Sequence, residues 1–278
     1  MSWGVVVGCS MLLAVGACES SSSPSAVDAG FETGSFETGT TDTGGPDVSA
    51  PDTSVEDAAP EAGPDAFDAG FCLPSAPNLV SWWTGDSVFT DHQGVNPGAQ
   101  VGAVSFVAGK VGQGFLTSVG NYVEVPDSAS LDVSSAITIE AWINITNAGS
   151  TGRIVDKITA GLGDGYLLDI VGGKLRFLVG DDAHRLDSPA DVPVGTFVHV
   201  AGAYDGINMK VYVAGAEVAT LAVTGAIPTN ALTLRLGADS NTANAFDGVI
   251  DEASLYSRAL TGVEIAAISN AGAFGRCK

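Results

Sequence analysis

Residues 246–260 read Phe246-Asp-Gly-Val-Ile-Asp-Glu-Ala-Ser-Leu-Tyr-Ser-Arg-Ala-Leu260, and this stretch decides the fold because it predicts a strand near the C-terminal end. In a strand, whose side chains alternate with a period of two, Val249, Asp251, Ala253 and Leu255 share one face. Asp251 therefore points where apolar side chains point. A buried carboxylate needs a cation, an arginine or several N–H donors. What this stretch does depends on what contacts Asp251.

A helix is predicted directly after this strand. Thr261-Gly-Val-Glu264 is a capping box, in which the threonine and glutamate side chains each bond a backbone N–H of the other residue. It predicts a short helix from Thr261 to about Asn270.

Strand-like runs with turn residues between them fill the rest of residues 71–278. The clearest runs are Val80–Trp83, Tyr122–Val125, Ile137–Ile143, Tyr166–Ile170, Lys174–Val179, Phe197–Tyr204, Lys210–Val213, Leu232–Leu236 and Val249–Tyr256. Many short strands at this spacing predict a two-sheet antiparallel sandwich or jelly roll. We therefore expect an all-β domain at 71–278, with one short C-terminal helix and a disordered tail before it.

Charge is distributed unevenly along the 278 residues. Every Lys and Arg lies at or beyond Lys110, and residues 19–70 hold 12 acidic and no basic residues. After residue 70 there are 20 acidic and 11 basic residues, and no stretch resembles a basic groove. Because nucleic-acid binding depends on clustered Lys and Arg, the composition argues against a nucleic-acid partner.

The N-terminal end predicts export. Val5 to Ala17 form an apolar run that is too short to span a bilayer, which favours a signal peptide over residues 1–17. Its end, Val15-Gly-Ala-Cys18, resembles the lipobox of bacterial lipoproteins, in which the cysteine is acylated. We expect a lipid anchor at Cys18 on the cell envelope, at the outer membrane or cell surface; a plain secretory peptide is the alternative.

Residues 18–70 predict a disordered acidic tether. They are rich in Ser, Thr, Asp, Pro and Gly and almost without aliphatic side chains. Such a segment cannot bury enough apolar surface to offset the entropy lost on ordering. A flexible coil of this length would span about 40 Å, enough to hold a domain clear of a membrane.

Two cysteines lie beyond the signal and the tether. Cys72 and Cys277 stand at the two edges of the predicted domain. In an exported protein the simplest interpretation is a disulfide that joins them, whereas neither has the histidine neighbour or CxxC spacing that favours a reactive thiol.

The order of motifs along residues 79–277 resembles the laminin-G-like jelly-roll family of the concanavalin A-like lectin/glucanase superfamily. The motifs that carry the resemblance are Trp82-Trp-Thr-Gly-Asp86, Gly109-Lys-Val-Gly-Gln-Gly-Phe115, Tyr122-Val-Glu-Val-Pro-Asp127, Ile137-Thr-Ile-Glu-Ala-Trp142, Arg153-Ile-Val, Val198-His-Val-Ala-Gly-Ala-Tyr-Asp-Gly206, Met209-Lys-Val-Tyr-Val213, Gly248-Val-Ile-Asp-Glu252 and Tyr256-Ser-Arg-Ala-Leu260. The resemblance implies two curved antiparallel sheets, often with a structural Ca²⁺, used mainly to bind sugars or proteins.

The resemblance also implies a place for calcium, near the last strand and a loop close to the start of the domain. Asp251 and Asp91 are the leading ligands because Ca²⁺ takes six to eight oxygen ligands, and Asp86 is a weaker candidate for the same shell. The alternatives are that Asp251 pairs with Arg258 or accepts hydrogen bonds from backbone N–H groups.

Glu140 and Trp142 form a second candidate site. They share the polar side of their predicted strand, opposite Ile139 and Ala141. An exposed tryptophan beside a carboxylate can stack on a sugar ring and bond its hydroxyls. The alternative is that Trp142 fills the space between the two sheets.

Enzyme motifs are missing. The glycosidases of this superfamily need Glu-x-Asp-x-x-Glu on one strand, and no such spacing occurs. There is also no Gly-x-Ser-x-Gly, Walker A or dinucleotide motif.

The sequence therefore predicts a non-enzymatic, lipid-anchored surface module. We expect it to recognise carbohydrate or another extracellular polymer. The alternative is a structural or adhesive envelope protein that contacts other proteins without affinity for glycans.

Overall fold

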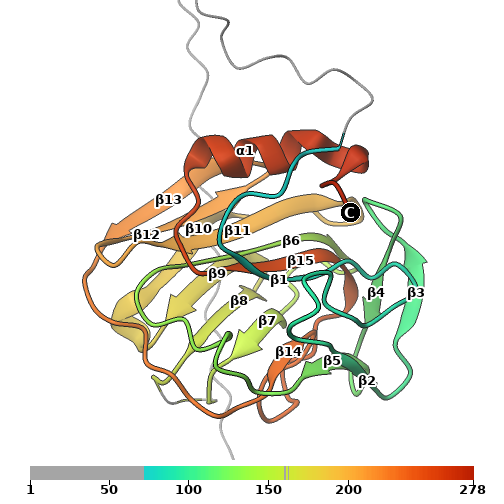
Figure 1. Cartoon of the computed structure of the whole chain (residues 1–278), viewed down its shortest axis with the longest axis horizontal. Coiled ribbons are helices and arrows are strands. Elements are labelled where there is room, and N and C mark those ends of the chain that lie inside the picture. Colours follow the sequence, from blue (N-terminus) through green and yellow to red (C-terminus); the bar gives the residue numbers. More distant parts are fainter. Residues whose placement is uncertain (1–71, 160, 162) are drawn as a thin grey trace, which may run out of the picture. The chain divides into compact units, whose positions relative to one another are not determined.

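Two sheets packed face to face make up the part of the chain that the computed structural model describes, residues 72–159, 161 and 163–278 (Figure 1). All pairs between neighbouring strands are antiparallel. The predicted all-β sandwich is thus confirmed. The predictions for residues 1–17, residues 18–70 and Cys18 lie outside the described residues. No helix in the described part is long and apolar enough to cross a membrane.

The first sheet has the strand order β13-β12-β11-β6-β15-β4-β3, and β1 also pairs with β15. Its strands are β1 (Leu79–Trp83), β3 (Ser105–Ala108), β4 (Gln113–Thr117), β6 (Ile137–Ile145), β11 (Val198–Tyr204), β12 (Asn208–Val213), β13 (Ala216–Ala222) and β15 (Gly248–Tyr256).

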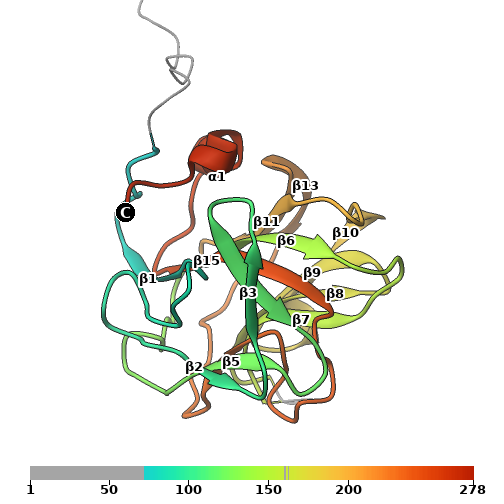
Figure 2. The ribbon, with the colours of Figure 1, turned by 90° about the vertical axis from the view of Figure 1, so that its right-hand side faces the viewer.

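The second sheet has the order β10-β9-β8-β7-β14-β5-β2. Its strands are β2 (Ala99–Val101), β5 (Tyr122–Val125), β7 (Gly152–Lys157), β8 (Tyr166–Val171), β9 (Lys174–Val179), β10 (Arg185–Asp191) and β14 (Leu234–Leu236). Three short helices complete the described fold: η1 (Asp182–His184), α1 (Gly262–Ala271) and η2 (Gly272–Phe274). Figure 2 shows the two sheets from the side, with α1 beyond the first sheet.

The core lies between the sheets because alternate residues of each strand are apolar. In β6, the side chains of Ile137, Ile139 and Ile143 are all buried on this inner side. Burying such a side chain stabilises the fold by about 1.5–3 kcal/mol. The packing is close: a Cβ added at Gly202 of β11 would lie 2.3 Å from the ring of Phe177 in β9.

Helix α1 covers part of the outer face of the first sheet. Its capping box is confirmed, since the Glu264 N–H donates to Thr261 Oγ1 at 3.3 Å and the Thr261 N–H donates to Glu264 Oε2 at 2.8 Å. Ile265 and Ile268 pack with Tyr212 in an apolar cluster that is separate from the core between the sheets. One side of the first sheet is therefore closed by the C-terminal part of the chain.

A β-bulge interrupts β15 at Glu252. Asp251 pairs with Trp142 of β6, but Ser254 pairs with Glu140, so β15 advances three residues while β6 advances two. Glu252 takes up the extra residue with a φ of 55°. A bulge of this kind inserts one residue into one strand of an antiparallel pair.

The bulge corrects the predicted face of Asp251. Val249 and Asp251 lie on the outer face of the first sheet, where they pair with outward residues of β6. Beyond Glu252 the alternation is reversed, and Ala253 and Leu255 lie in the core between the sheets. The prediction that these four residues share a face was wrong, because one residue with positive φ shifts the alternation.

A disulfide joins the two ends of the described fold. Cys72 and Cys277 are bonded, with their Cα atoms 4.8 Å apart and a sequence separation of 205, which confirms the predicted pairing. Leu73 reinforces the closure: its N–H donates to Gly275 O and its carbonyl accepts from the Cys277 N–H, both at 2.9 Å. Figure 1 shows the C-terminus beside the start of the described chain.

Candidate functional site

Glu140 and Trp142 are covered rather than exposed. Glu140 is 0% and Trp142 7% exposed, so the prediction of an exposed Trp–carboxylate surface was wrong. The Lys110 ammonium lies 4.8 Å from the centre of the Trp142 ring. The His199 ring packs against the Trp142 ring, with 5.4 Å between the ring centres. Trp142 does not fill the space between the sheets either, because Ala141 and Ile143 point there. It packs on the outer face of the first sheet.

Arg276 holds Glu140 in a buried polar cluster. Glu140 Oε1 lies 3.3 Å from the Arg276 guanidinium, and Glu140 Oε2 lies 2.7 Å from His199 Nε2. Burial alone would raise the pKa of Glu140, but the Arg276 charge and the His199 hydrogen bond outweigh it and lower that pKa. Arg276 also donates to Tyr256 Oη at 2.6 Å and to the Ser254 hydroxyl. We call Glu140, His199, Ser254, Tyr256 and Arg276 the Arg276 cluster.

Glu252 extends this cluster toward the C-terminus. The indole N–H of Trp82 donates to Glu252 Oε2 at 2.9 Å, and the Lys278 ammonium lies 3.0 Å from Glu252 Oε1. Burial raises the pKa of Glu252, and Lys278 partly offsets this. The Arg276 guanidinium stacks on the Trp82 ring, 4.2 Å from its centre. These contacts fasten the C-terminal segment to the first sheet.

Asp251 accepts hydrogen bonds from two backbone N–H groups. The Lys110 and Val111 N–H groups donate to Asp251 Oδ2 at 2.7 and 2.9 Å. Oδ1 is buried and has no hydrogen-bond partner among the described residues. Burial raises the pKa of Asp251 to about 8. Of the two alternatives, backbone donors are the one found, since Arg258 instead pairs with Glu264.

Asp91 and Asp86 are also bonded to N–H groups. Four backbone N–H groups donate to the Asp91 carboxylate, at distances of 2.7 to 3.3 Å. Asp86 accepts from the Gln113 N–H at 2.9 Å and pairs with Lys278. The three carboxylates thus contact N–H groups and, at Asp86, the Lys278 ammonium, and calcium bound to them stays a prediction. No cluster of three His, Cys, Asp or Glu side chains that could hold a metal occurs at residues 72–159, 161 and 163–278.

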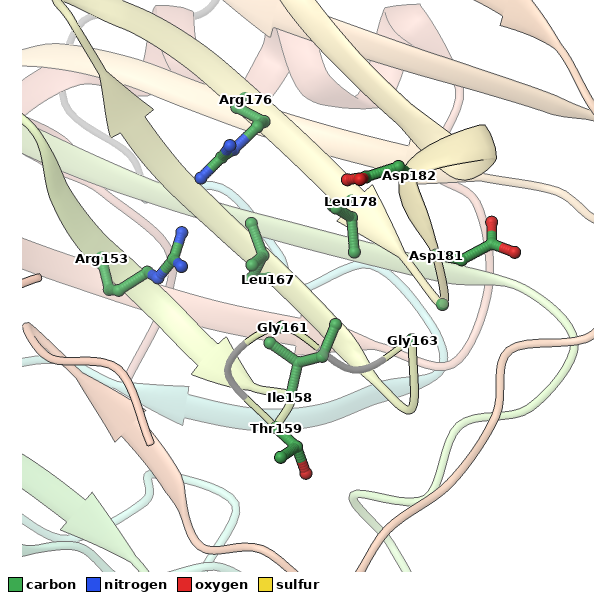
Figure 3. A pocket seen from close by; sticks show the side chains of 11 residues that line it. Arg153, Ile158, Thr159, Gly161, Gly163, Leu167, Arg176, Leu178, Asp181 and Asp182 are labelled. Atoms are coloured by element: carbon green, nitrogen blue, oxygen red, sulfur yellow. The ribbon is translucent and has the colours of Figure 1, made fainter. Parts of the chain in front are cut away.

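The second sheet carries a pocket of about 240 Å³ on its outer face (Figure 3). Ile158, Leu167 and Leu178 form its apolar floor and are 3–7% exposed. Arg153 and Arg176 stand on one side, and Figure 3 shows their guanidinium groups extending toward each other. We call this the Arg153 pocket.

The two arginines share one buried carboxylate. Asp169 is 0% exposed and accepts from Arg176 Nε at 2.9 Å and Arg176 Nη2 at 2.6 Å, a two-pronged pairing. Arg153 Nη1 donates to the same carboxylate. The strand register explains this geometry, because Arg153, Asp169 and Arg176 are direct cross-strand neighbours on β7, β8 and β9.

Asp156 lies in the next cross-strand row. It pairs with Leu167 on one side and with Arg235 of β14 on the other. Its carboxylate is 3.2 Å from Arg153 Nε. Burial raises the pKa of Asp156 to about 7, although the Arg153 charge opposes the shift.

Asp181 and Asp182 stand across the floor from the arginines. The Asp181 carboxylate accepts from the Ala183 N–H at 3.1 Å and lies 3.0 Å from His184 Nδ1. Figure 3 shows the Asp182 carboxylate turned toward the pocket and that of Asp181 turned away from it. The pocket thus has N–H donors on one wall and a carboxylate acceptor on the opposite wall.

Sequence reasoning missed Arg153, Asp169 and Arg176 as a group. Each is a charged residue in a strand-like run, at the position where a side chain points outward. That alternation could have marked them as members of an outer face. It could not have shown that the three residues are neighbours, because the register between strands cannot be read from any one segment.

The model of the Laminin_G_3 family, described as the concanavalin A-like lectin/glucanases superfamily, matches residues 117–266. No curated protein sequence matches the chain.

Many solved structures resemble the fold, and three of them represent the range of proteins found. Domain 4 of AbnA, a GH43 extracellular arabinanase from Geobacillus stearothermophilus, in complex with arabinotriose, has 20% identity over 68% of this chain and 97% of its own, with a TM-score of 0.57. The binding domain of Paraclostridial Mosquitocidal Protein 1 has 18% identity over 70% of this chain and 52% of its own, with a TM-score of 0.57. The third is a structure of botulinum neurotoxin type C, a toxin whose cell entry is dependent upon interaction with two ganglioside molecules. It has 15% identity over 70% of this chain and 51% of its own, with a TM-score of 0.56.

At these identities the three likenesses show the fold alone, and the chain spans about half the length of the two toxin chains. The family model is more specific, because it covers more than half of the chain and includes the eleven strands from β5 to β15, among them β6, β11 and β15 at the centre of the first sheet. On these grounds, the chain belongs to the concanavalin A-like lectin/glucanases superfamily.

Proposed function

We propose that this protein is a lipid-anchored surface module that binds carbohydrate through the Arg153 pocket and has no catalytic activity. The observation that carries the proposal is the pocket itself, where two arginines and an aspartate border an apolar floor. Sugars present hydroxyls at their edges and C–H groups on their faces, and both kinds of surface have partners here. The structural relatives support it: one is in complex with arabinotriose, and the other two are toxin structures, a binding domain and one linked to gangliosides.

Arg153 and Arg176 are the residues to test, but removing either charge would leave the buried Asp169 with one arginine partner instead of two. Lysine keeps the charge and removes the fork of N–H donors. We expect Arg153→Lys and Arg176→Lys each to lower glycan affinity at least tenfold, with the melting temperature nearly unchanged. Arg185→Lys is the matched control, because Arg185 also pairs with an aspartate on this sheet but does not line the pocket.

The experiment is a glycan array with the full-length protein, in calcium and in excess chelator. Binding of at least one glycan class by the wild type and by Arg185→Lys, but not by the pocket variants, supports the proposal. If the wild type binds no glycan and captures an envelope protein instead, the proposal is wrong and the adhesive role replaces it. The chelator arm tests calcium, which stays a prediction.

The anchor is proposed at Cys18. Acylation there would place the protein in the membrane fraction without a transmembrane helix. We expect Cys18→Ser to move the protein to the soluble fraction, as judged by fractionation and by loss of fatty-acid labelling. Cys9→Ser is the control, because Val6-Val-Gly-Cys9 has a similar local pattern after a much shorter apolar run. Equal labelling of wild type and Cys18→Ser would contradict the anchor.

A further inference from the structure

We propose that the Arg153 pocket selects an uncharged sugar residue and excludes sugars that carry a carboxylate. This inference rests on the proposed function and names the ligand class for the same site. It is argued from three features of the pocket: how its arginines are already engaged, where its donors and acceptors stand, and how large it is.

Both arginines already donate hydrogen bonds to a buried carboxylate. Asp169 is 0% exposed, and the Nε and Nη2 groups of Arg176 both donate to it. An acidic sugar would bind an arginine best through the same two-pronged contact. To do so it would have to displace Asp169, which cannot turn to water, and an unpaired buried charge is strongly destabilising. The arginine pair is therefore not a site for a second carboxylate.

The remaining donors suit hydroxyl groups. Arg153 Nη2 and Arg176 Nη1 donate no hydrogen bond within the described ranges, and both arginines line the pocket. Asp182 supplies an acceptor on the opposite wall (Figure 3). A sugar hydroxyl both donates and accepts a hydrogen bond, so a neutral ring can bond the arginines at one edge and Asp182 at the other.

The surrounding charge also opposes acids. Two arginines and two aspartates, Asp181 and Asp182, line the pocket, and both arginines are already paired with buried aspartates, Asp169 and, for Arg153, also Asp156. Asp182 is exposed and turned toward the pocket, so a ligand carboxylate would meet it directly. Like charges at this range repel, and the repulsion is screened by salt.

The volume fits one small ring. A pocket of about 240 Å³ is below the roughly 300–1,000 Å³ of sites for drug-sized ligands. The buried side chains of Ile158, Leu167 and Leu178 set its depth. The described residues that line it are arginine, aspartate, threonine, glycine, leucine and isoleucine. Without an aromatic ring among them, selectivity depends on hydrogen bonds and charge rather than on stacking.

The test compares matched pairs of glycans on the full-length protein. Each pair consists of an acidic oligosaccharide and its neutral counterpart: uronic-acid oligosaccharides with their carboxyl-reduced forms, and sialyllactose with lactose. In every pair that shows binding, we expect the neutral member to bind at least tenfold more tightly than the acidic one. Raising the salt concentration should lower this ratio of affinities, because salt screens the repulsion of the acidic member.

Asp182→Asn is the diagnostic variant. It keeps an acceptor oxygen and removes the negative charge, so the neutral member should retain most of its affinity while the ratio to the acidic member falls several-fold. Asp191→Asn is the matched control, because Asp191 is an exposed aspartate at the far end of β10 in the same sheet and does not line the pocket.

The two levels of the proposal fail differently. If acidic members bind as tightly as neutral ones or more tightly, and Arg153→Lys abolishes that binding, the inference falls and the glycan-binding function stands. An unchanged ratio in Asp182→Asn also overturns the inference. If no member of any pair binds, the proposed function itself is wrong.

Discussion

The outer faces of the two sheets both carry arginine–carboxylate clusters, but the cluster on the first sheet is covered by the chain and that on the second sheet is not. Arg276 on the first sheet is 3% exposed and lies in the C-terminal segment, which closes over Glu140 and His199. On the second sheet, the side chains of Arg153 and Arg176 are 11% and 16% exposed and border a pocket. A ligand can therefore reach the arginines of the second sheet but not the arginine of the first.

The difference teaches how to assign a role to a charge cluster in this fold. A cluster closed over by its own chain has no donor left that a ligand can reach, so its effect is on stability and on which arrangement the chain adopts. A cluster with guanidinium edges at a pocket can still donate. Substitutions in the first cluster should change unfolding, whereas substitutions in the second should change binding.

Arg276→Met should be the most destabilising of the variants. It leaves Glu140 as an uncompensated buried charge, and breaking such a pair costs about 3–5 kcal/mol in the free energy of unfolding. Denaturant titration measures the loss. Adding Glu140→Gln should recover part of it, because the unpaired charge is then gone.

Arg258→Met is the control for Arg276→Met. Arg258 pairs with Glu264, but both side chains are partly exposed, so the loss should stay within about 1 kcal/mol. Equal losses of unfolding free energy in Arg258→Met and Arg276→Met would show that burial of the ion pair does not decide how much it stabilises the fold. Neither variant should change glycan affinity at temperatures where it remains folded.

The disulfide comes next in size. Replacing Cys72 and Cys277 with serine should lower the free energy of unfolding by about 2–4 kcal/mol, since the bond closes a long loop in the unfolded chain. Cys277 follows Arg276 directly, and the Trp82 ring lies under the guanidinium. We expect reduction to loosen this segment first and to shift tryptophan fluorescence before global unfolding. A fluorescence change that coincides with global unfolding would contradict this order.

Much of the architecture followed from local sequence. The alternating apolar residues of Ile137–Ile143 and the Thr261 capping box predicted a strand and a helix that the structure confirms. The pairing of Cys72 with Cys277 followed from their positions at the edges of an exported domain. Each of these features depends on short-range patterning or on simple counting.

The candidate sites were harder because they depend on long-range register and on cover. The face of Asp251 was mispredicted, since nothing in the alternation of β15 announces the positive φ of Glu252. Trp142 lies on the polar side of its strand, as predicted, but that side is covered. Arg153 and Arg176 both pair with Asp169 of β8, and the sequence does not reveal the strand register that brings them there.

Asp251→Asn should change the pH dependence of stability. The unfolded pKa of an aspartate is about 3.9, and burial raises the folded pKa of Asp251 to about 8. The folded state therefore binds the extra proton between these values, and its stability is fully present below the unfolded pKa and falls as pH rises to about 8. The slope is at most about 1.4 kcal/mol per pH unit. The variant should lack this loss.

Urea titrations from pH 4 to 9 measure the difference between wild type and Asp251→Asn, with the exposed Asp247→Asn as control. Adding calcium in a parallel series tests the metal prediction. A calcium site at Asp251 would keep it ionised, so calcium would stabilise the wild type at pH 7 and not the variant. Parallel stability curves for wild type and Asp251→Asn at all pH values would contradict the raised pKa.

Asp156→Asn is the counterpart on the second sheet and should show a smaller pH effect than Asp251→Asn. Burial raises the folded pKa of Asp156 to about 7, so its stabilising proton is lost over a shorter interval, from about pH 4 to 7. The groups that face it are Arg153, Arg235 and Asp239, and the two arginines limit the shift. We expect the wild type to lose stability relative to Asp156→Asn across that interval and to change little above pH 7. A difference that continues to grow to pH 8, as expected for Asp251, would mean that this side of the second sheet is covered as fully as the first.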